Sequence, residues 1–336
     1  MAFKMIQEGM DVTALARGKR LADLKEHGLV LENGITGEIE SAPVKVVEAL
    51  KPDDKYDLIM VVMRKNQALQ ILDTLAANKH GEILFMMNNV SGFKELTDAL
   101  GKERIMVGFP LPGGRRKDHM MQIIPATEKK PYTIPIGEVD GTIKPRTKRI
   151  AQLLEKMEGY KVEIRKDMDA WLKYHAAVLG VSFTPALFAT DIDVNRFAET
   201  RDAIVLAIRG IRAAFAALKK AGVPMSPKLF ILLKILPEPL LVLIFKNAVK
   251  EKEMEISGEG HLRDAKDEML HLIQEFREFV RSKGVETPFL DSLWRYAEDP
   301  NMPLLPEGSK EIPVSWKGVG IFGGIVAAII ALLIFL

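Results

Sequence analysis

The sequence predicts an α/β domain with a doubly wound sheet, followed by an all-α domain and a C-terminal transmembrane helix. Up to about residue 166, short apolar segments alternate with helical ones, a pattern typical of βαβ units. From residue 169 to about residue 296, helical periodicity dominates. The last 18 residues carry no charge. A chain of 336 residues is long enough for about two domains, each with its own core.

In the α/β part, residues 1–9 are predicted as a helix closed by glycine and residues 11–16 as a short buried strand. Residues 56–63, YDLIMVVM, are almost wholly apolar, which favours a strand buried on both faces of a parallel sheet. The remaining alternation predicts strands at 29–32, 44–47, 82–87, 104–109 and 161–164, helices at 20–27, 67–76, 92–100 and 146–158, and extra strands and loops within 110–145.

Residues 229–249 are strongly apolar, but charged residues and prolines interrupt them, so two buried helices are predicted there. Residues 299–315, rich in proline, are interpreted as a linker. The predicted boundaries are therefore 1–166 for the α/β domain, 167–298 for the helical domain, 299–315 for the linker and 316–336 for the transmembrane helix.

The C-terminal segment has the features of a single membrane anchor. Eighteen uncharged residues are close to the minimum for crossing a bilayer as a helix, and Trp316 and Lys317 precede them as interfacial anchors. A helix docked on the protein surface is the alternative, but it would need a polar face that this segment lacks. The sequence thus predicts a membrane-anchored protein whose main body is cytoplasmic.

Composition excludes several kinds of site. Lys and Arg number 47 against 45 acidic residues, which gives no electrostatic reason to expect nucleic acid as a partner. The absence of cysteine removes disulfides, thiol nucleophiles and cysteine-ligated metals. The six histidines show no metal-binding spacing, so no metal is predicted.

Ligands of open α/β sheets bind at the carboxyl ends of the strands, so the loops after strands carry the candidate chemistry. A basic cluster that begins with Arg17 follows the first predicted strand. Positive charge at this point suits a 2′-phosphate and favours NADP over NAD, although a solvated basic turn explains it equally well. Arg64 and Gln67 follow the strand at 56–63, and Asn88 follows the next strand. The asparagine could face a nicotinamide or a carboxylate, but asparagine also favours such turns for conformational reasons.

Lys173 lies near the start of an apolar helix, where the α/β pattern ends and the helical pattern begins. If the chain is an enzyme, this lysine is the best candidate for its chemistry. The alternative is a boundary lysine whose methylene stem packs while its ammonium reaches water. His175 is a less suitable acid because it lies two residues further on and points to another part of the helix surface.

Six local patterns occur in a characteristic order: EGMDVTALARG, VVMRKNQ, MMNNVSGFKEL, GRRKD, AWLKYHAAV and DEMLHL followed by KGVETP. In this order the chain resembles the ketopantoate reductase family, NADPH-dependent enzymes that reduce a 2-oxo acid to a 2-hydroxy acid, over most of residues 1–296. The resemblance implies a Rossmann-like first domain, NADP as cofactor, a 2-oxo acid as substrate, Arg17 at the 2′-phosphate, Arg64 and Gln67 near the cofactor phosphates and nicotinamide ribose, Asn88 at cofactor and substrate, Lys173 as the catalytic lysine, and Glu268 close to substrate and lysine.

Two departures from the family pattern limit what is transferred. The family carries asparagines one and two turns after the lysine, where this chain has Ala177 and Val181. We therefore expect an oxo acid other than ketopantoate, or a loss of activity, because a buried carboxylate without partners is costly.

The first Rossmann strand and its GxGxxG turn are also missing from the sequence, so weak NADP binding is expected. A start codon assigned too far downstream is the preferred explanation over a degenerate relative. The alternative function is a non-catalytic, membrane-tethered protein that keeps the fold and has lost the cofactor. The oligomeric state is left open, with a homodimer as one option.

Overall fold

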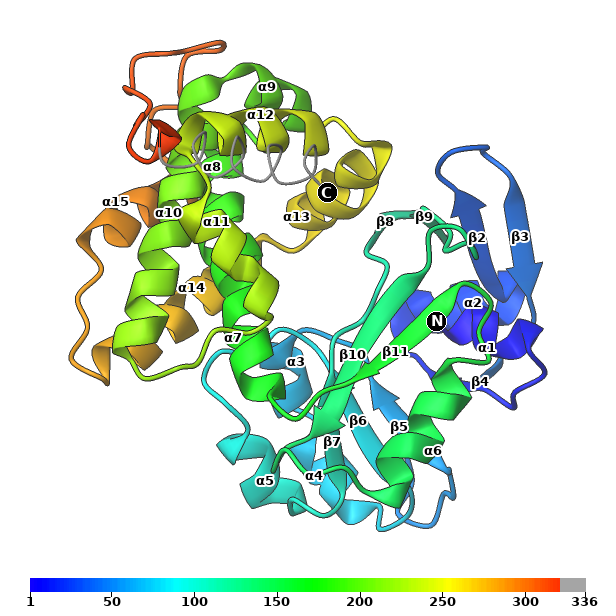
Figure 1. The fold of residues 1–336 in the computed structure, drawn as a ribbon. Coiled ribbons are helices and arrows are strands. Elements are labelled where there is room, and N and C mark those ends of the chain that lie inside the picture. Colours follow the sequence, from blue (N-terminus) through cyan, green and yellow to red (C-terminus); the bar gives the residue numbers. More distant parts are fainter. Residues whose placement is uncertain (321–336) are drawn as a thin grey trace, which may run out of the picture. The chain divides into compact units, whose positions relative to one another are not determined.

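The computed structural model describes residues 1–320, apart from the side chains at positions 261 and 264 (Figure 1). The chain forms two compact units. The first consists of Met1–Leu172 and Glu255–His271, and the second of Lys173–Met254 and the chain from Leu272 onward. The boundary falls within helix α7 (Met168–Val178), between Leu172 and Lys173. Each unit is described by itself below.

The first unit is built on a five-stranded sheet with the order β11-β10-β7-β6-β5. Strands β5, β6 and β7 are parallel, β10 runs antiparallel to β7, and β11 is parallel to β10 (Figure 1). Apolar runs of the sequence form the inner strands β6, β7 and β10, whose side chains are mostly buried. The strand bounds are β5 (Leu58–Val61), β6 (Glu82–Met86), β7 (Ile105–Gly108), β10 (Tyr132–Glu138) and β11 (Tyr160–Ile164).

Helices cover both faces of this sheet, as a doubly wound fold requires. On β6, Ile83 and Phe85 pack into one core with side chains of α3, α4, α5 and the start of α7. Leu84 and Met86 point to the opposite face and pack with α6 and residues of α1. The bounds are α1 (Ala2–Gln7), α3 (Lys65–Leu69), α4 (Leu72–Ala77), α5 (Lys94–Leu100) and α6 (Pro145–Leu154). The predicted Rossmann-like α/β architecture is confirmed.

Two smaller sheets complete the strands of this unit. Strand β1 (Thr13–Leu15) pairs only with β4 (Lys45–Val47), in parallel, among the described residues. A four-stranded sheet has the order β3-β2-β9-β8, with β2 (Leu29–Asn33), β3 (Ile39–Ala42), β8 (Gly114–Lys117) and β9 (Met120–Ile123). Helix α2 (Gly18–His27) leads into it through Gly28, where a Cβ atom would lie 2.4 Å from the carbonyl oxygen of Ala42.

The strand predicted at residues 56–63 differs from expectation in its burial. Strand β5 bonds only to β6 within the described residues, and most of its side chains are half-buried. Val62 and Met63, which follow it, are exposed. The predicted burial on both faces is therefore only partial: β5 side chains pack into the core on each face, but β5 is an edge strand among the described residues.

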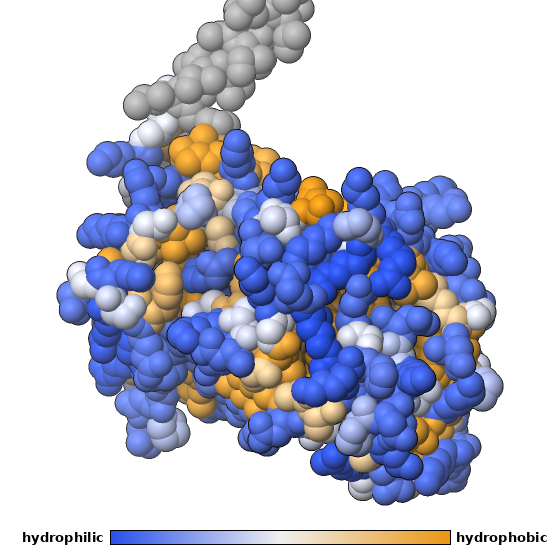
Figure 2. Space-filling model, turned by 90° about the horizontal axis from the view of Figure 1, so that it is seen from below, coloured by the Kyte–Doolittle hydropathy of each residue, from blue (hydrophilic) through white to orange (hydrophobic). Residues whose placement is uncertain are grey.

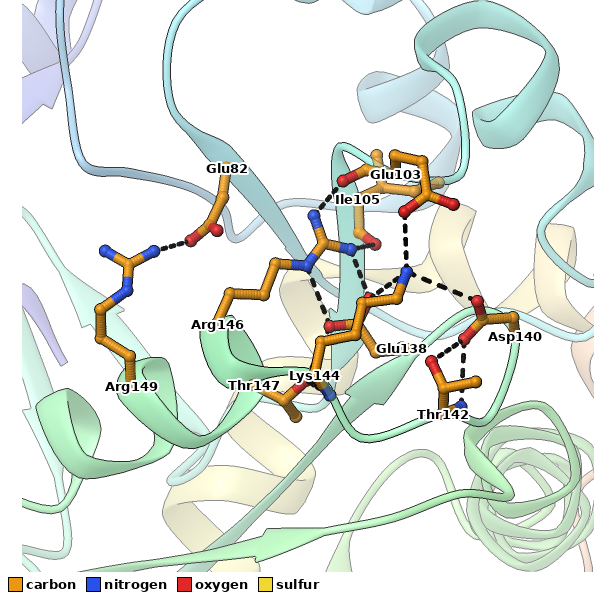
Figure 3. Close-up of polar contacts among 10 residues, drawn as sticks. All are labelled: Glu82, Glu103, Ile105, Glu138, Asp140, Thr142, Lys144, Arg146, Thr147 and Arg149. Carbon is orange, nitrogen blue, oxygen red and sulfur yellow. Dashed lines mark hydrogen bonds and ion pairs between the residues drawn. The ribbon is translucent and has the colours of Figure 1, made fainter.

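A network of charges lies at the end of the sheet where β6 and β7 begin (Figure 3). The carboxylate of Glu138, at the end of β10, is fully buried and accepts hydrogen bonds from Arg146 Nε at 2.9 Å and from the Thr147 hydroxyl at 2.7 Å. Lys144 adds ion pairs to Glu138 at 3.6 Å and to Glu103 at 3.0 Å. These contacts join the first turn of α6 to the sheet.

The second unit is helical, as predicted. The long helix α10 (Arg201–Lys220) is mostly buried and contacts η1, α8, α12 and α15. Trp294 of α15 is buried and donates a hydrogen bond from its indole nitrogen to the carbonyl oxygen of Val181 at 2.8 Å. The bounds are η1 (Leu179–Phe183), α8 (Thr184–Phe188), α9 (Val194–Glu199), η2 (Lys228–Phe230), α11 (Ile231–Ile235), α12 (Glu238–Ala248) and α15 (Pro288–Glu298).

Three elements lie along residues 254–281: η3 (Met254–Glu259), α13 (Gly260–Asp264) and α14 (Lys266–Arg281). The boundary between the units crosses α14, between His271 and Leu272. In the first unit, α13 packs on strand β8, where a Cβ atom at Gly260 would lie 2.8 Å from a side-chain carbon of Arg115. The first turn of α14 therefore belongs to the sheet-containing unit, and the rest of the helix to the helical one.

The proline-rich segment before the C-terminus is fastened to α9 and α10 by charged side chains. Arg196 donates to the carbonyl oxygen of Leu305 at 2.7 Å, and Arg201 donates to that of Ile312 at 3.0 Å. The buried carboxylate of Asp202 accepts from the backbone N–H groups of Glu311 and Ile312. These bonds hold the backbone of residues 305–312 against the helical unit.

Two predictions need correction. The predicted transmembrane helix is wrong for the described structure, because no helix within residues 1–320 is long and apolar enough to cross a bilayer. Residues 321–336, on which most of the predicted span falls, lie outside the described residues. The fold of the described residues is a Rossmann-like domain followed by a helical domain.

Residues 229–249 do form two helices, but the prediction that both are buried is wrong. Leu229, Ile235 and Leu243 are each more than half exposed. Figure 2 shows apolar patches between hydrophilic side chains on one face of the molecule. Charges and prolines in this segment excluded a membrane span, but they did not show which apolar side chains the core covers.

Candidate active site

The first group of site residues lies at the carboxyl ends of β5 and β6. Asn88 follows β6 and donates a hydrogen bond from its amide nitrogen to Glu268 Oε1 at 2.8 Å. Glu268 is buried in the first turn of α14, 180 residues further along the chain. Two of the predicted site residues therefore meet within the first unit.

Arg64 joins the same group. It follows β5, and its guanidinium lies 2.6 Å from a carboxylate oxygen of Asp267 and 3.9 Å from one of Glu268. Burial acts against the charged form of Asp267, but Arg64 and nearby backbone N–H groups outweigh it and hold the pKa of this carboxyl below its ordinary value. The position of both carboxylates in the first turn of α14 also favours their negative charge.

Lys65 was not singled out from the sequence, yet it connects the two loops. Its ammonium is buried and donates to Asn89 Oδ1 at 3.1 Å and to the Ser91 hydroxyl, and it forms an ion pair with Glu95 at 3.3 Å. The start of α3 is thereby tied to the loop that carries Asn88. A lysine in the first turn of a helix is usually solvated, so no local signal marked it.

Arg17 and Gln67 are less engaged. Arg17 lies between β1 and α2 and is exposed, and its Nε donates to the carbonyl oxygen of Glu48 at 3.0 Å. No carboxylate within the described residues pairs with it. Gln67 is exposed on α3, where its backbone N–H bonds to Arg64 and Asn66. The structure thus brings Asn88, Arg64 and Glu268 together, whereas Arg17 follows strand β1 of a separate sheet.

Lys173 belongs to the second unit, whereas Glu268 belongs to the first. Its side chain is only 2% exposed, and the ammonium lies 4.9 Å from the centre of the Phe279 ring, within the range of a cation–π contact. Ala177 and Val181 are fully buried, so the helix beyond the lysine is lined by apolar side chains. Burial lowers the pKa of His175 to about 4, which leaves its imidazole neutral at pH 7 and unsuited as a proton donor.

The part of the chain that the structure describes shows no candidate metal site. No group of three or more His, Asp or Glu side chains there could hold a metal ion. The charged groups that do converge, Arg64 with Asp267 and Glu268, form ion pairs with one another.

Comparison with known proteins shows sequence similarity to reductases and oxidoreductases. Residues 1–127 match the family model of ketopantoate reductase PanE/ApbA. An uncharacterized oxidoreductase of Bacillus subtilis, YkpB, is 25% identical over 177 residues, which are 51% of this chain and 55% of that protein. The chain thus aligns with only about half the length of this curated relative.

Several solved structures share the fold over most of the chain. The 2-dehydropantoate 2-reductase of Geobacter metallireducens GS-15 aligns with 88% of this chain and 93% of its own, at 16% identity and a TM-score of 0.64. A ketopantoate reductase of Ralstonia eutropha JMP134 aligns with 88% of this chain and 92% of its own, at 13% identity and a TM-score of 0.64. D-mandelate dehydrogenase with NADH and anilino(oxo)acetate aligns with 88% of this chain and 93% of its own, at 14% identity and a TM-score of 0.68. The N-terminal part of the chain is thus similar to the ketopantoate reductase family, and the chain shares the fold of solved reductases and a dehydrogenase.

Proposed function

We propose that this protein reduces a 2-oxo acid to a 2-hydroxy acid with NADPH, and that its substrate is not ketopantoate. The observation that carries the proposal is the meeting of Asn88, Arg64 and Glu268 at the carboxyl ends of two parallel strands. Open α/β sheets bind their ligands at this edge. The match of residues 1–127 to a reductase family model and the fold shared with a dehydrogenase solved with NADH support the same reaction class.

The residues present fit parts of the cofactor. Arg17 is an exposed cation after β1 that pairs with no carboxylate among residues 1–320 as described, and it would hold the 2′-phosphate of NADP. Asn88 and Gln67 offer amide groups at the ends of neighbouring parallel strands, towards the nicotinamide ribose and the substrate. Arg64 would contact the cofactor phosphates once its pairing with Asp267 is exchanged for them. When bound, the reduced nicotinamide supplies the hydride.

Lys173 is the proposed acid. Hydride addition to a carbonyl carbon builds negative charge on the oxygen, and a lysine ammonium stabilises that charge and then donates its proton. The side chain is buried, so the charge acts in surroundings of low dielectric constant where its effect is large. Glu268, which accepts a hydrogen bond from Asn88, is proposed as the carboxylate near the substrate.

The side chains after Lys173 bear on the substrate. Ala177 and Val181 offer no hydrogen bond to a hydroxyl or carboxylate, and both are fully buried. A site that lacks such donors discriminates against a polar substrate, because the polar groups of the bound substrate are buried without hydrogen-bond partners. We therefore expect preference for a 2-oxo acid with an apolar substituent over one with a hydroxyl group, such as ketopantoate.

The proposal is tested by measuring NADPH oxidation at 340 nm with a panel of 2-oxo acids. Lys173→Ala is expected to lower turnover at least about 100-fold, the usual contribution of a general acid. The same variant should keep the rise in melting temperature that NADPH causes in the native protein. Lys166→Ala, at an exposed lysine before α7, is the matched control and should change neither quantity.

Two results would contradict the proposal. Equal loss of NADPH binding and turnover in Lys173→Ala would show that this lysine holds the fold or cofactor rather than donating a proton. Turnover of ketopantoate faster than that of apolar 2-oxo acids would refute the inference drawn from Ala177 and Val181.

A second candidate is a non-catalytic protein that keeps the reductase fold. The pairing of Arg64 with Asp267 favours it, because this ion pair neutralises the cation expected at the cofactor phosphates. Calorimetric titration of the full chain with NADPH and NADH separates the two readings. Absence of binding by either nucleotide would favour the non-catalytic protein.

A further inference from the structure

Helix α14 presents one stripe of side chains to the region of Lys173. Leu272, Glu275 and Phe279 are three and four residues apart, a spacing that places them on one face of a helix. Leu272 and Glu275 are buried, and Phe279 is half-buried. Glu275 therefore stands within an apolar stripe where a carboxylate is costly unless a charged or hydrogen-bonding group answers it.

Two contacts fix how this stripe meets the helix that carries Lys173. The ammonium of Lys173 lies over the ring of Phe279. At Gly180 the side chain of Leu272 comes so close that an added Cβ atom would lie 2.2 Å from it. Going along the chain from Lys173 to Gly180, the contacting residues on α14 therefore go in the opposite direction, from Phe279 to Leu272. The two segments are antiparallel, and all four residues belong to the second unit.

This register places Glu275 level with Ala177. Glu275 precedes Phe279 by one helical turn, and Ala177 follows Lys173 by one turn. Ala177 is fully buried and has only a methyl group, so at this level α7 itself contributes no polar side chain. A lysine side chain is long enough to bring its ammonium across one turn.

We propose that Glu275 is a positioning residue that pairs with Lys173 across α7 and α14, keeping the ammonium charged and aimed. A carboxylate within a few ångströms favours the protonated lysine, whereas burial alone favours the neutral amine. At position 177, where the family carries an asparagine, this chain thus has a carboxylate from the neighbouring helix beside the lysine. Glu268, the carboxylate expected beside Lys173 from the family resemblance, belongs to the first unit and accepts a hydrogen bond from Asn88 there.

Other charged groups around this pair are accounted for. Burial keeps His175 of α7 neutral at pH 7. On α14, Arg277 stacks on Trp294 and forms ion pairs with Asp291 and Glu298, and Glu278 accepts a hydrogen bond from Gln274. Glu268 and His271 belong to the part of α14 in the first unit. Of the acids on α14 in the second unit, Glu275 is the one on the stripe that contains Phe279.

The inference rests on the proposed function only for its effect on turnover, and its test reads the charge state of Lys173 directly. Competitive acetylation of the full chain with acetic anhydride between pH 7 and 11, followed by mass spectrometry, gives the pKa of this amine. Glu275→Gln should lower it by at least about one pH unit, which is tenfold in the fraction deprotonated. Glu275→Asp should restore part of the shift. Glu278→Gln, exposed on the same helix, is the control and should leave it unchanged.

An unchanged pKa of Lys173 in Glu275→Gln would overturn the proposal, and so would a shift seen in Glu268→Gln but not in Glu275→Gln. If Glu275→Gln folds poorly, melting temperatures of Lys173→Met, Glu275→Gln and the double variant answer the question. A pair in contact gives a double variant that loses less than the two single losses added together. Additive losses would refute the contact. Failure of the full chain to reduce any 2-oxo acid would leave both measurements valid.

Discussion

The buried carboxylate of Glu138 is expected to be the costliest single charge to remove from the first unit. Its side chain is fully buried, and the Arg146 side chain that binds it twice is only 11% exposed (Figure 3). Glu138→Gln leaves the mostly buried Arg146 with a neutral partner. Breaking a buried pair in this way costs about 3–5 kcal/mol, and the glutamine oxygen still serves Thr147, so about 3 kcal/mol is expected.

The expected loss is large enough to measure by thermal unfolding. For a unit of this size, each kcal/mol corresponds to about 2–4 °C, so the melting temperature of the first unit should fall by roughly 6–12 °C. Glu82→Gln is the matched control at the same end of the sheet, because Glu82 pairs with the largely exposed Arg149. Exposed pairs contribute about 0–1 kcal/mol. A loss in Glu138→Gln no larger than that in Glu82→Gln would refute the reasoning.

The loss of stability in Glu138→Gln is also expected to depend on pH. Burial disfavours the charged carboxylate of Glu138, but Arg146 and Thr147 outweigh burial and hold its pKa below the ordinary value of 4.5. A carboxyl whose folded pKa is lowered contributes stability above its unfolded pKa and loses it as the pH falls through the folded one. The stability difference between wild type and Glu138→Gln should therefore be full at pH 7 and shrink below about pH 4.5. A constant difference down to pH 2 would contradict it.

Three further outcomes are expected. Asp267→Asn should raise NADPH affinity about fivefold in calorimetric titration, because a half-exposed partner worth about 1 kcal/mol no longer competes for Arg64; weaker binding would show that the pair orders the site instead. Arg17→Ala should weaken NADPH about tenfold and leave NADH unchanged, since only NADPH carries the 2′-phosphate; equal loss for both would remove this role. Burial lowers the pKa of His175 from 6.5 to about 4, so this residue contributes stability above pH 6.5 that is lost as the pH falls towards 4. His175→Gln should flatten unfolding curves recorded in that window, and an unchanged slope would contradict it.

Most strands and helices of the first unit followed from local sequence, but the pairing of the strands did not. Apolar runs located β5, β6 and β7 because burial on a sheet selects such residues. The helix predicted at residues 67–76 is two helices, α3 and α4, with a break at residues 70–71 that no glycine or proline marks. Strand β3 was missed because its residues, IESA, carry only two apolar side chains and are mostly exposed.

The site shows the same division between local and distant information. Arg64 and Asn88 could be found because they directly follow predicted strands. Their partners Asp267 and Glu268 lie 203 and 180 residues away, and a distance of that kind comes from the fold and not from periodicity. The resemblance to a family supplied Glu268, but it did not supply Asp267, and Asp267 is the residue that neutralises Arg64.

The carboxylates of α14 connect these observations to the chemistry. One helix carries Asp267 and Glu268 in a turn that belongs to the sheet-containing unit, and Glu275 in the turns that belong to the helical unit. In the first unit Arg64 and Asn88 engage the first two. In the second, the register of Leu272 with Gly180 and of Phe279 with Lys173 leaves Glu275 as the acid beside the lysine. If Glu275 pairs with Lys173, then Lys173 stays protonated whether or not a nucleotide displaces Asp267 from Arg64. Substitutions could then alter the proton donor and the cofactor site independently of one another.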